Sequence, residues 1–199
     1  MFRYLFPFLL IMLLGACARQ PVVPEDSRQL AWEQHRSLVM NLKDWKIQGR
    51  VGLYTADEAW PGDLHWQQSD AQYDMRIIAP MGAGNLHVYS VEGGVMLEHS
   101  SNTQAHFTPD PEALIQQQFG WMLPMKNLRY WITGIPSPLV NIQGKLDLDA
   151  QGRLNSLKQS GWNISFLRYQ ELKGLALPQK VLLEHEDLSL KIVIRKWQI

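Results

Sequence analysis

The sequence predicts a mainly β domain in which about 10–11 antiparallel strands form one curved sheet, together with three helices. Apolar and polar residues alternate along most of residues 45–194, which is the pattern of strands with one buried face. Short turn signals such as Gly93-Gly94 separate these runs, and three other segments have helical spacing instead. A sheet with so many strands must curl or close.

Length and composition favour one globular domain and exclude several classes of protein. The chain has 199 residues, of which 46% are hydrophobic, so it can form a core and is not intrinsically disordered. Lys plus Arg and Asp plus Glu both number 19, and this balance argues against a nucleic-acid-binding protein. The single cysteine excludes an internal disulfide framework and a Cys-rich zinc site.

Three segments predict helices. In the first, Asp26 or Ser27 is a suitable cap, and an apolar face extends to Leu42. The second follows Thr108 or Asp110 and ends at Gly120, and the third covers residues 124–134. The predicted strands cover residues 45–54, 64–67, 73–79, 86–89, 95–98, 140–148, 154–159, 162–169, 180–185 and 188–195.

The first 16 residues predict a secretory signal peptide. Arg3 precedes an apolar run over residues 4–14, which is too short to span a bilayer of about 30 Å hydrocarbon thickness. Leu14-Gly15-Ala16-Cys17 resembles the lipobox of bacterial lipoproteins, in which the cysteine receives three acyl chains. We therefore expect residues 1–16 to be removed, Cys17 to be lipidated, and residues 17–26 to form a lipid-anchored flexible tether. An ordinary signal peptide with a buried cysteine is the alternative.

The resemblance also implies a membrane location. Three chains would hold the protein permanently, because each buried CH₂ contributes about 0.8 kcal/mol. Ala18 follows Cys17 where many lipoproteins retained in the inner membrane have Asp, so we expect the outer membrane, with the domain facing the periplasm.

No pattern in the sequence predicts catalysis. The six histidines are scattered, and no zinc-binding motif is present. Glu184-His185-Glu186 does not suit a metal, because successive strand residues point to opposite faces. There is no nucleophile elbow and no phosphate-binding loop. We expect no enzyme activity, no catalytic residue, no metal and no cofactor.

The segment from Ile77 to Gly84 is unusual for a turn because it is apolar. Met81 occupies its tip, between Pro80 and Gly82. The residues alone allow two interpretations: Met81 folds back onto the core, or it points outward.

Several stretches together resemble the LolB family of outer-membrane lipoprotein receptors. They are residues 32–35 (WEQH), 41–42 (NL), 45–50 (WKIQGR), 64–68 (LHWQQ), 80–82 (PMG) and 123–136 (LPMKNLRYWITGIP). The resemblance extends over residues 32–199, within a predicted lipoprotein-binding domain at 27–199.

The resemblance implies an incomplete, open antiparallel barrel in which helices cover an apolar cavity. It implies a monomeric receptor that accepts lipoprotein cargo from the periplasmic carrier LolA, binds the acyl chains in the cavity and inserts the cargo into the outer membrane. It also implies that Pro80, Met81 and Gly82 form a membrane-delivery loop, with Met81 at a position that is usually Leu. The alternative is a non-catalytic assembly or structural lipoprotein with a filled core and no acyl ligand.

Strand parity then selects candidate residues for the cavity lining, with two more from the helical cover. The candidates are Val51, Leu53, Trp66, Met75, Ile77, Leu86, Val88, Leu97, Trp131 and Ile132. A register error of one residue would reverse the assignment within a strand.

Overall fold

The computed structural model describes residues 24–82, 84–100, 102–120 and 122–199. The predicted signal peptide, Cys17 and most of the predicted tether lie outside these residues. In the part that is described, no helix is long and apolar enough to cross a membrane.

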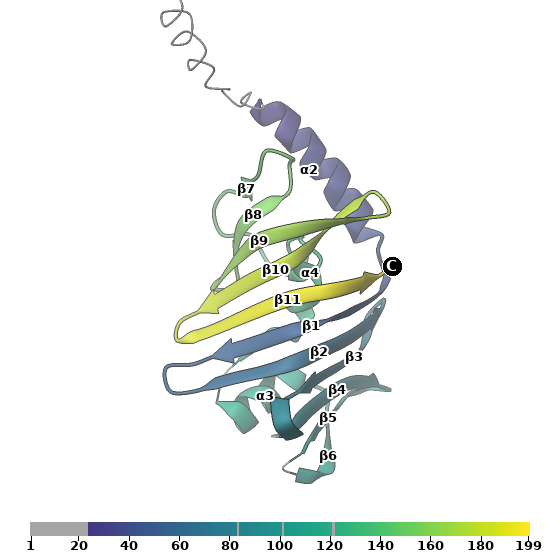
Figure 1. The fold of residues 1–199 in the computed structure, drawn as a ribbon, viewed down its shortest axis with the longest axis vertical. Coiled ribbons are helices and arrows are strands. Elements are labelled where there is room, and N and C mark those ends of the chain that lie inside the picture. Colours follow the sequence, from purple (N-terminus) through teal and green to yellow (C-terminus); the bar gives the residue numbers. More distant parts are fainter. Residues whose placement is uncertain (1–23, 83, 101, 121) are drawn as a thin grey trace, which may run out of the picture.

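One antiparallel sheet dominates the described chain, and its eleven strands confirm the predicted fold class (Figure 1). The strand order is β6-β5-β4-β3-β2-β1-β11-β10-β9-β8-β7, so β6 and β7 are edges and the sheet is not closed into a barrel. The strands are β1 (Asp44–Tyr54), β2 (Ala59–Ser69), β3 (Gln72–Ile78), β4 (Asn85–Val91), β5 (Gly94–His99), β6 (Asn102–Thr108), β7 (Asp147–Leu148), β8 (Leu154–Gln159), β9 (Trp162–Leu172), β10 (Leu175–His185) and β11 (Leu188–Gln198).

Two meanders meet at the centre of this sheet. Strands β1 to β6 form one and β7 to β11 form the other, and they join where β1 pairs with β11. The β1–β11 register shifts between Gln48 and Gly49. A Cβ atom at Gly49 would lie 2.2 Å from the carbonyl oxygen of Val193, so the irregularity needs a glycine.

Three α-helices and one 3₁₀ turn complete the described fold. They are α2 (Glu25–Met40), α3 (Pro111–Phe119), α4 (Met125–Trp131) and η2 (Pro80–Gly82). Helix α2 begins before the predicted caps Asp26 and Ser27, with Pro24 at its N-cap. The prediction for α3 is confirmed: Asp110 accepts hydrogen bonds from the N–H groups of Glu112 and Ala113, and Gly120 ends the helix at φ 78°.

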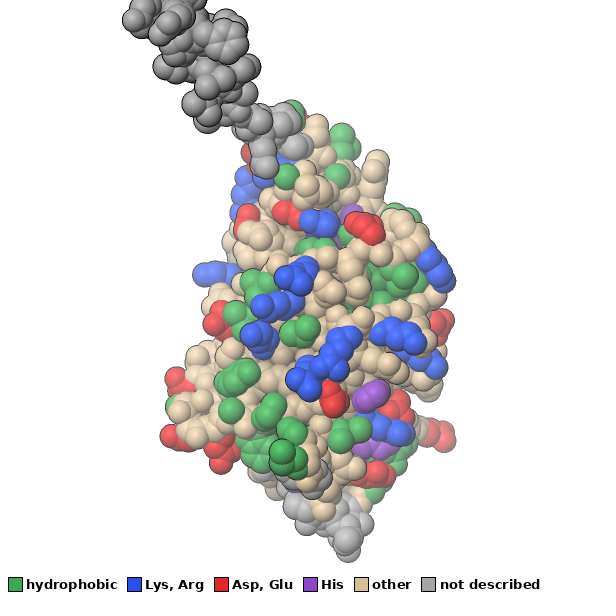
Figure 2. Space-filling view, in the orientation of Figure 1, with side chains coloured by type: hydrophobic (Ala, Val, Ile, Leu, Met, Phe, Trp, Pro, Cys, Tyr) green, Lys and Arg blue, Asp and Glu red, His purple; other side chains and the backbone are tan. Residues whose placement is uncertain are grey.

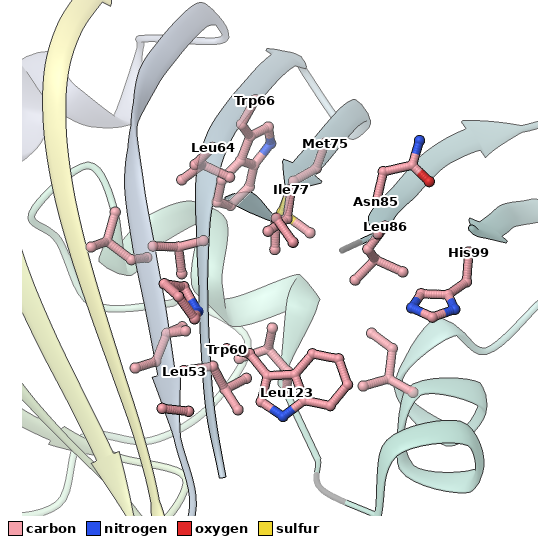
Figure 3. A pocket seen from close by; sticks show the side chains of 18 of the residues that line it. Leu53, Trp60, Leu64, Trp66, Met75, Ile77, Asn85, Leu86, His99 and Leu123 are labelled. Atoms are coloured by element: carbon pink, nitrogen blue, oxygen red, sulfur yellow. The ribbon is translucent and has the colours of Figure 1, made fainter. Parts of the chain in front are cut away.

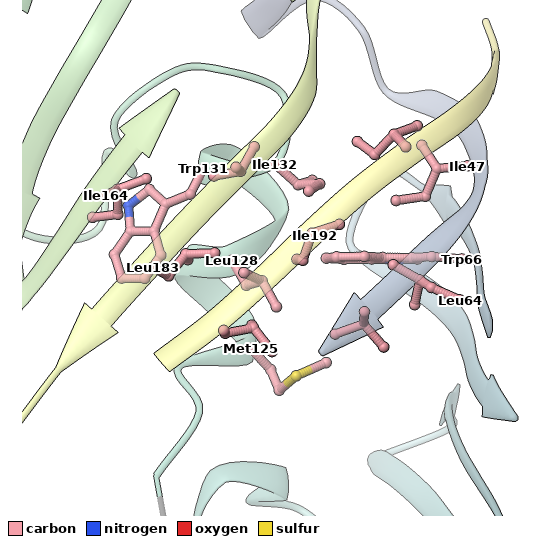
Figure 4. Packing of buried hydrophobic residues seen from close by; sticks show 14 of the residues in the cluster. Ile47, Leu64, Trp66, Met125, Leu128, Trp131, Ile132, Ile164, Leu183 and Ile192 are labelled. Carbon is pink, nitrogen blue, oxygen red and sulfur yellow. The ribbon is translucent and has the colours of Figure 1, made fainter. Parts of the chain in front are cut away.

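The core fills the space between the inner face of the sheet and the helices. Leu128 and Trp131 of α4 pack against inner-face residues such as Leu183 and Ile192 (Figure 4). The buried hydrophobic residues extend from Trp32 to Trp197. The described residues therefore form a core by themselves.

A buried polar side chain fixes α4 and the following loop to β8. Gln159 is fully buried, and its side-chain oxygen accepts hydrogen bonds from Trp131 Nε1 at 2.7 Å and from the Ser137 N–H at 2.9 Å. Its amide nitrogen donates to the carbonyl oxygens of Ser137 and Val140, both at 2.8 Å. These hydrogen bonds pair polar groups of the interior that would otherwise be buried without a partner, which would destabilise the fold.

The strands differ clearly from the prediction at four places. Strand β2 begins at Ala59, five residues before the predicted start at residue 64. Strand β6 is additional. The strand predicted at 140–148 is reduced to β7, because residues 141–145 are exposed and pair only through an isolated bridge between Ile142 and Gln159. Strand β10 begins at Leu175, although Pro178 lacks an N–H group, and the β9–β10 register shifts on either side of Lys180.

Candidate functional site

An apolar cavity of about 530 Å³ lies between the inner face of β1–β4 and helices α3 and α4 (Figure 3). The alternation of side chains places Leu64 and Trp66 of β2 on this face, next to Met75 and Ile77 of β3. Leu86 of β4 pairs with Ile77 and continues the wall. The lining is hydrocarbon over most of its extent because one face of each of these strands is apolar.

Six of the predicted candidates line the cavity. They are Val51, Leu53, Trp66, Met75, Ile77 and Leu86. In these strands, parity was enough to identify the side of the sheet that faces the cavity.

The other four candidates do not line it. Val88 and Leu97 are a directly paired, fully buried couple on β4 and β5, so they belong to the packed core. Trp131 and Ile132 are also fully buried, and the Trp131 indole is bound to Gln159. Helix α4 presents Leu128 to the cavity instead. The alternation of side chains along a strand identifies which residues lie on the inner face. It does not show how far the cavity extends along that face.

The remaining lining residues were not predicted. They are Glu58, Ala59, Trp60, Pro61, Leu64, Ala79, Pro80, Gly84, Asn85, His99, Ile115, Leu123, Leu128, Leu190 and Ile192. Leu64 could have been found, because it shares the parity of Trp66. The positions of Ile115 and Leu128 depend on how two helices dock, which no local sequence pattern specifies.

Exposed lining residues mark the mouth of the cavity. Trp60 is 48% exposed, and its Nε1 donates a 2.9 Å hydrogen bond to Oε2 of Glu58. Glu58 and His99 are the ionisable residues of the lining. Elsewhere, among the residues that the structure describes, no group of three or more His, Cys, Asp or Glu could hold a metal. The site is therefore suited to a hydrocarbon ligand with a polar end at the mouth.

The turn η2 lies beside this mouth. Pro80 lines the cavity, whereas Met81 is 105% exposed. The outward interpretation of Met81 is therefore correct, and the core interpretation is wrong. Met81 has φ 55° and ψ 25°, a left-handed conformation that non-glycine residues rarely adopt. The N–H of Ala79 donates a 2.9 Å hydrogen bond to the Gly84 carbonyl oxygen, and this bond closes the turn that presents Met81.

Comparison with known proteins gives the family. The sequence profile described as "Outer membrane lipoprotein LolB" matches residues 43–197, most of the chain. The chain belongs to the LolB family. Outer-membrane lipoprotein LolB of Pseudomonas putida KT2440 is 36% identical over 98% of this chain and 96% of the relative. LolB of Stutzerimonas stutzeri A1501 is 35% identical over 98% and 94%. Membership of the LolB family places the chain among outer-membrane lipoproteins, the location that the sequence predicts.

Two solved structures also align with most of this chain, at low sequence identity. A LolA superfamily protein from Nitrosomonas europaea has a TM-score of 0.49 and 6% identity, over 87% of this chain and 93% of that one. A DUF1329 family protein from Desulfovibrio piger has a TM-score of 0.47 and 9% identity, over 90% and 93%.

Proposed function

We propose that this LolB-family chain is a non-catalytic receptor that accepts lipoproteins from the periplasmic carrier LolA and inserts them into the outer membrane. It holds the acyl chains of the cargo in the cavity and acts as a monomer attached through lipidated Cys17. The observation that carries this proposal is the cavity of about 530 Å³, whose mouth adjoins the fully exposed Met81.

The cavity meets the physical need of such cargo. A triacylated cysteine exposes dozens of CH₂ groups, and each contributes about 0.8 kcal/mol when it leaves water. A protein that moves such a group through water must therefore shield it. Sites of 300–1,000 Å³ suit small apolar ligands, and the flexible Met75 beside Ile77 and Leu86 can adapt to chains of different shape.

The turn η2 supplies the delivery step. An apolar side chain of this size gains roughly 1.5–3 kcal/mol when it is fully buried in an apolar phase. That is enough for a transient contact of Met81 with the bilayer and too little for a second anchor. Because Pro80 lines the cavity, this contact brings the mouth to the lipid surface, and the chains can pass downhill into the bilayer without an energy source.

The alternative function is an assembly or structural lipoprotein with a filled core. The apolar cavity favours the receptor, because a purely structural domain gains stability by packing that space.

A transfer experiment tests the proposal. A soluble chain carrying Cys17→Ala would be mixed with LolA loaded with a lipoprotein, and a photo-crosslinker at Leu86 would report contact with acyl chains. We expect crosslinks to the chains, and none from the same probe at Leu38, which is exposed on helix α2. Absence of cargo transfer, or equal crosslinking at both positions, would overturn the proposal.

A further inference from the structure

The outer face of the sheet carries a concentration of positive charge in a protein whose formal net charge is zero (Figure 2). Six cationic side chains on four adjacent strands make up this basic face. They are Arg50, Arg168, Lys180, Lys191, Arg195 and Lys196. Arg50, Lys180 and Lys191 lie on the side opposite the cavity, each next to at least one buried residue of the inner face. Arg195 and Lys196 lie at the β11 irregularity, and Arg168 is exposed at the β9–β10 irregularity, where it pairs with Lys180.

A single row of paired residues organises the face. Arg50 pairs with Val193, Val193 with Lys180, and Lys180 with Arg168. With strands about 4.8 Å apart, the row from β1 to β9 is about 14 Å long. Lys180 and Arg168 are directly opposite one another, an arrangement of like charges that destabilises a sheet. An anionic partner would remove this repulsion.

The same row of paired residues continues toward the turn η2. Arg50 pairs with Asp63, and Asp63 pairs with Ile78, which is 45% exposed and three residues before Met81. Asp63 accepts weak ion pairs from Arg50 at 3.5 Å and Arg195 at 3.9 Å, so it neutralises only part of the face. Glu184 and Asp44 lie at opposite ends of the sheet's outer face. Strand β2, with Asp63 on its outer face, therefore lies between the basic face and Ile78.

We propose that the basic face docks onto bilayers with anionic phospholipid headgroups, and thereby brings the neighbouring turn η2, with Met81, to the lipid surface. This inference rests on the proposed delivery role of Met81. It identifies the kind of membrane surface into which the cargo is inserted. Clusters of four to eight Lys and Arg next to an apolar element are typical of attachment to anionic membranes.

A fluid layer of headgroups fits this face better than an acidic protein does. Specific protein interfaces concentrate aromatic side chains in a desolvated centre. The row from Arg50 to Arg168 contains no aromatic side chain, and its cations are spread across a sheet surface on long flexible side chains.

Vesicle binding tests the proposal with the chain from residue 17 carrying Cys17→Ser, because the described residues form a core by themselves. Sedimentation would compare vesicles of phosphatidylcholine with vesicles of phosphatidylcholine mixed with phosphatidylglycerol. Each cation near an anionic surface contributes about a five-fold change in binding, so a variant with Lys180→Gln, Lys191→Gln and Lys196→Gln should lose about 100-fold on the anionic vesicles. The matched control carries Arg36→Gln, Lys126→Gln and Lys145→Gln, which lie outside the strands, and should bind as the unsubstituted chain does.

Three results would overturn the proposal: equal binding of the unsubstituted chain to both vesicles, binding that added salt does not weaken, or equal losses in the two triple variants. A basic-face variant that binds vesicles normally but no longer accepts cargo from LolA would also overturn it, in favour of a protein partner. Failure of every form to accept cargo, with the vesicle results as expected, would contradict the receptor function and leave the docking surface standing. Melting temperatures of both variants would show that each is folded.

Discussion

Pro80 lines the apolar cavity, and Met81, the next residue in the chain, is fully exposed beside the cavity mouth. The left-handed backbone of Met81 produces this reversal of direction within one residue. A ligand in the cavity and a surface in contact with Met81 are therefore only one turn of chain apart.

The substitution Met81→Glu separates uptake from delivery. Because Met81 is fully exposed, the charge needs no burial, and the melting temperature should stay within a few degrees of the original. Cargo uptake from LolA should be nearly unchanged, whereas delivery to vesicles should slow at least ten-fold, since roughly 1.5–3 kcal/mol of apolar contact is lost. The control Met81→Leu should be close to neutral. Normal delivery by Met81→Glu would show that the turn has no role in insertion.

A carboxylate in the cavity should abolish acyl binding. Leu86→Asp places a charge on the cavity wall, where a bound chain would exclude its water, so acceptance of acyl chains should fall at least ten-fold. The matched control is Leu38→Asp, since Leu38 is 59% exposed on helix α2. Transfer assays at equal folded fraction, checked by urea melts, would measure the difference. Equal transfer by the two variants would argue that the cavity does not hold the cargo.

Loss of the buried amide of Gln159 should destabilise the domain. Gln159→Leu leaves Trp131 Nε1, the Ser137 N–H and two carbonyl oxygens without their partner. An unsatisfied buried polar group costs about 1–3 kcal/mol, so the free energy of unfolding should fall by about 2–4 kcal/mol. The exposed Gln143 is the control, and Gln143→Leu should change the free energy of unfolding by about 0.5 kcal/mol or less. Denaturant titrations would reveal the difference, and similar values for both variants would refute the assignment.

Acid should destabilise the fold through His35. Burial, followed by the charge of Arg153, lowers the pKa of His35 below its ordinary value of 6.5, and its Nε2 is buried without a hydrogen-bond partner. Between the lowered pKa and the ordinary one, the unfolded chain binds more protons, so stability falls as the pH drops below about 6.5. His35→Gln removes this titration, and melting curves across this range should show a shallower pH dependence. An unchanged slope would mean that other groups dominate.

The lipid anchor should contribute location and not folding. The described core lies between Trp32 and Trp197, so Cys17→Ala should leave the cooperative melting transition unchanged. The variant should still accept cargo from LolA in solution. Its melting temperature, compared with that of the lipidated form in detergent, provides the measurement. A broad or absent transition would show that the anchor is needed for folding.

Periodicity in the sequence predicted the mainly β fold, because apolar and polar residues alternate along a strand that has one buried face. Periodicity did not predict the start of β10. The residues around Pro178 pair with β9, although proline has no N–H group to donate to the hydrogen-bonded ladder. The cavity could be predicted only in part. Ile77 and Leu86 follow from parity, whereas Leu123 and Leu128 reach the cavity through the docking of the helical cover, and Trp131 points instead to Gln159.

The position of β11 has a consequence for folding during synthesis. The last strand of the chain, Leu188–Gln198, pairs with β1 and β10 at the middle of the sheet. A chain that emerges with its N-terminus first exposes one edge of β1 until Leu188–Gln198 arrives, and such an unpaired edge is prone to aggregation. The two meanders can join only after β11 has emerged. Loss of the last ten or so residues would therefore divide the protein at its centre, rather than shorten it at an edge.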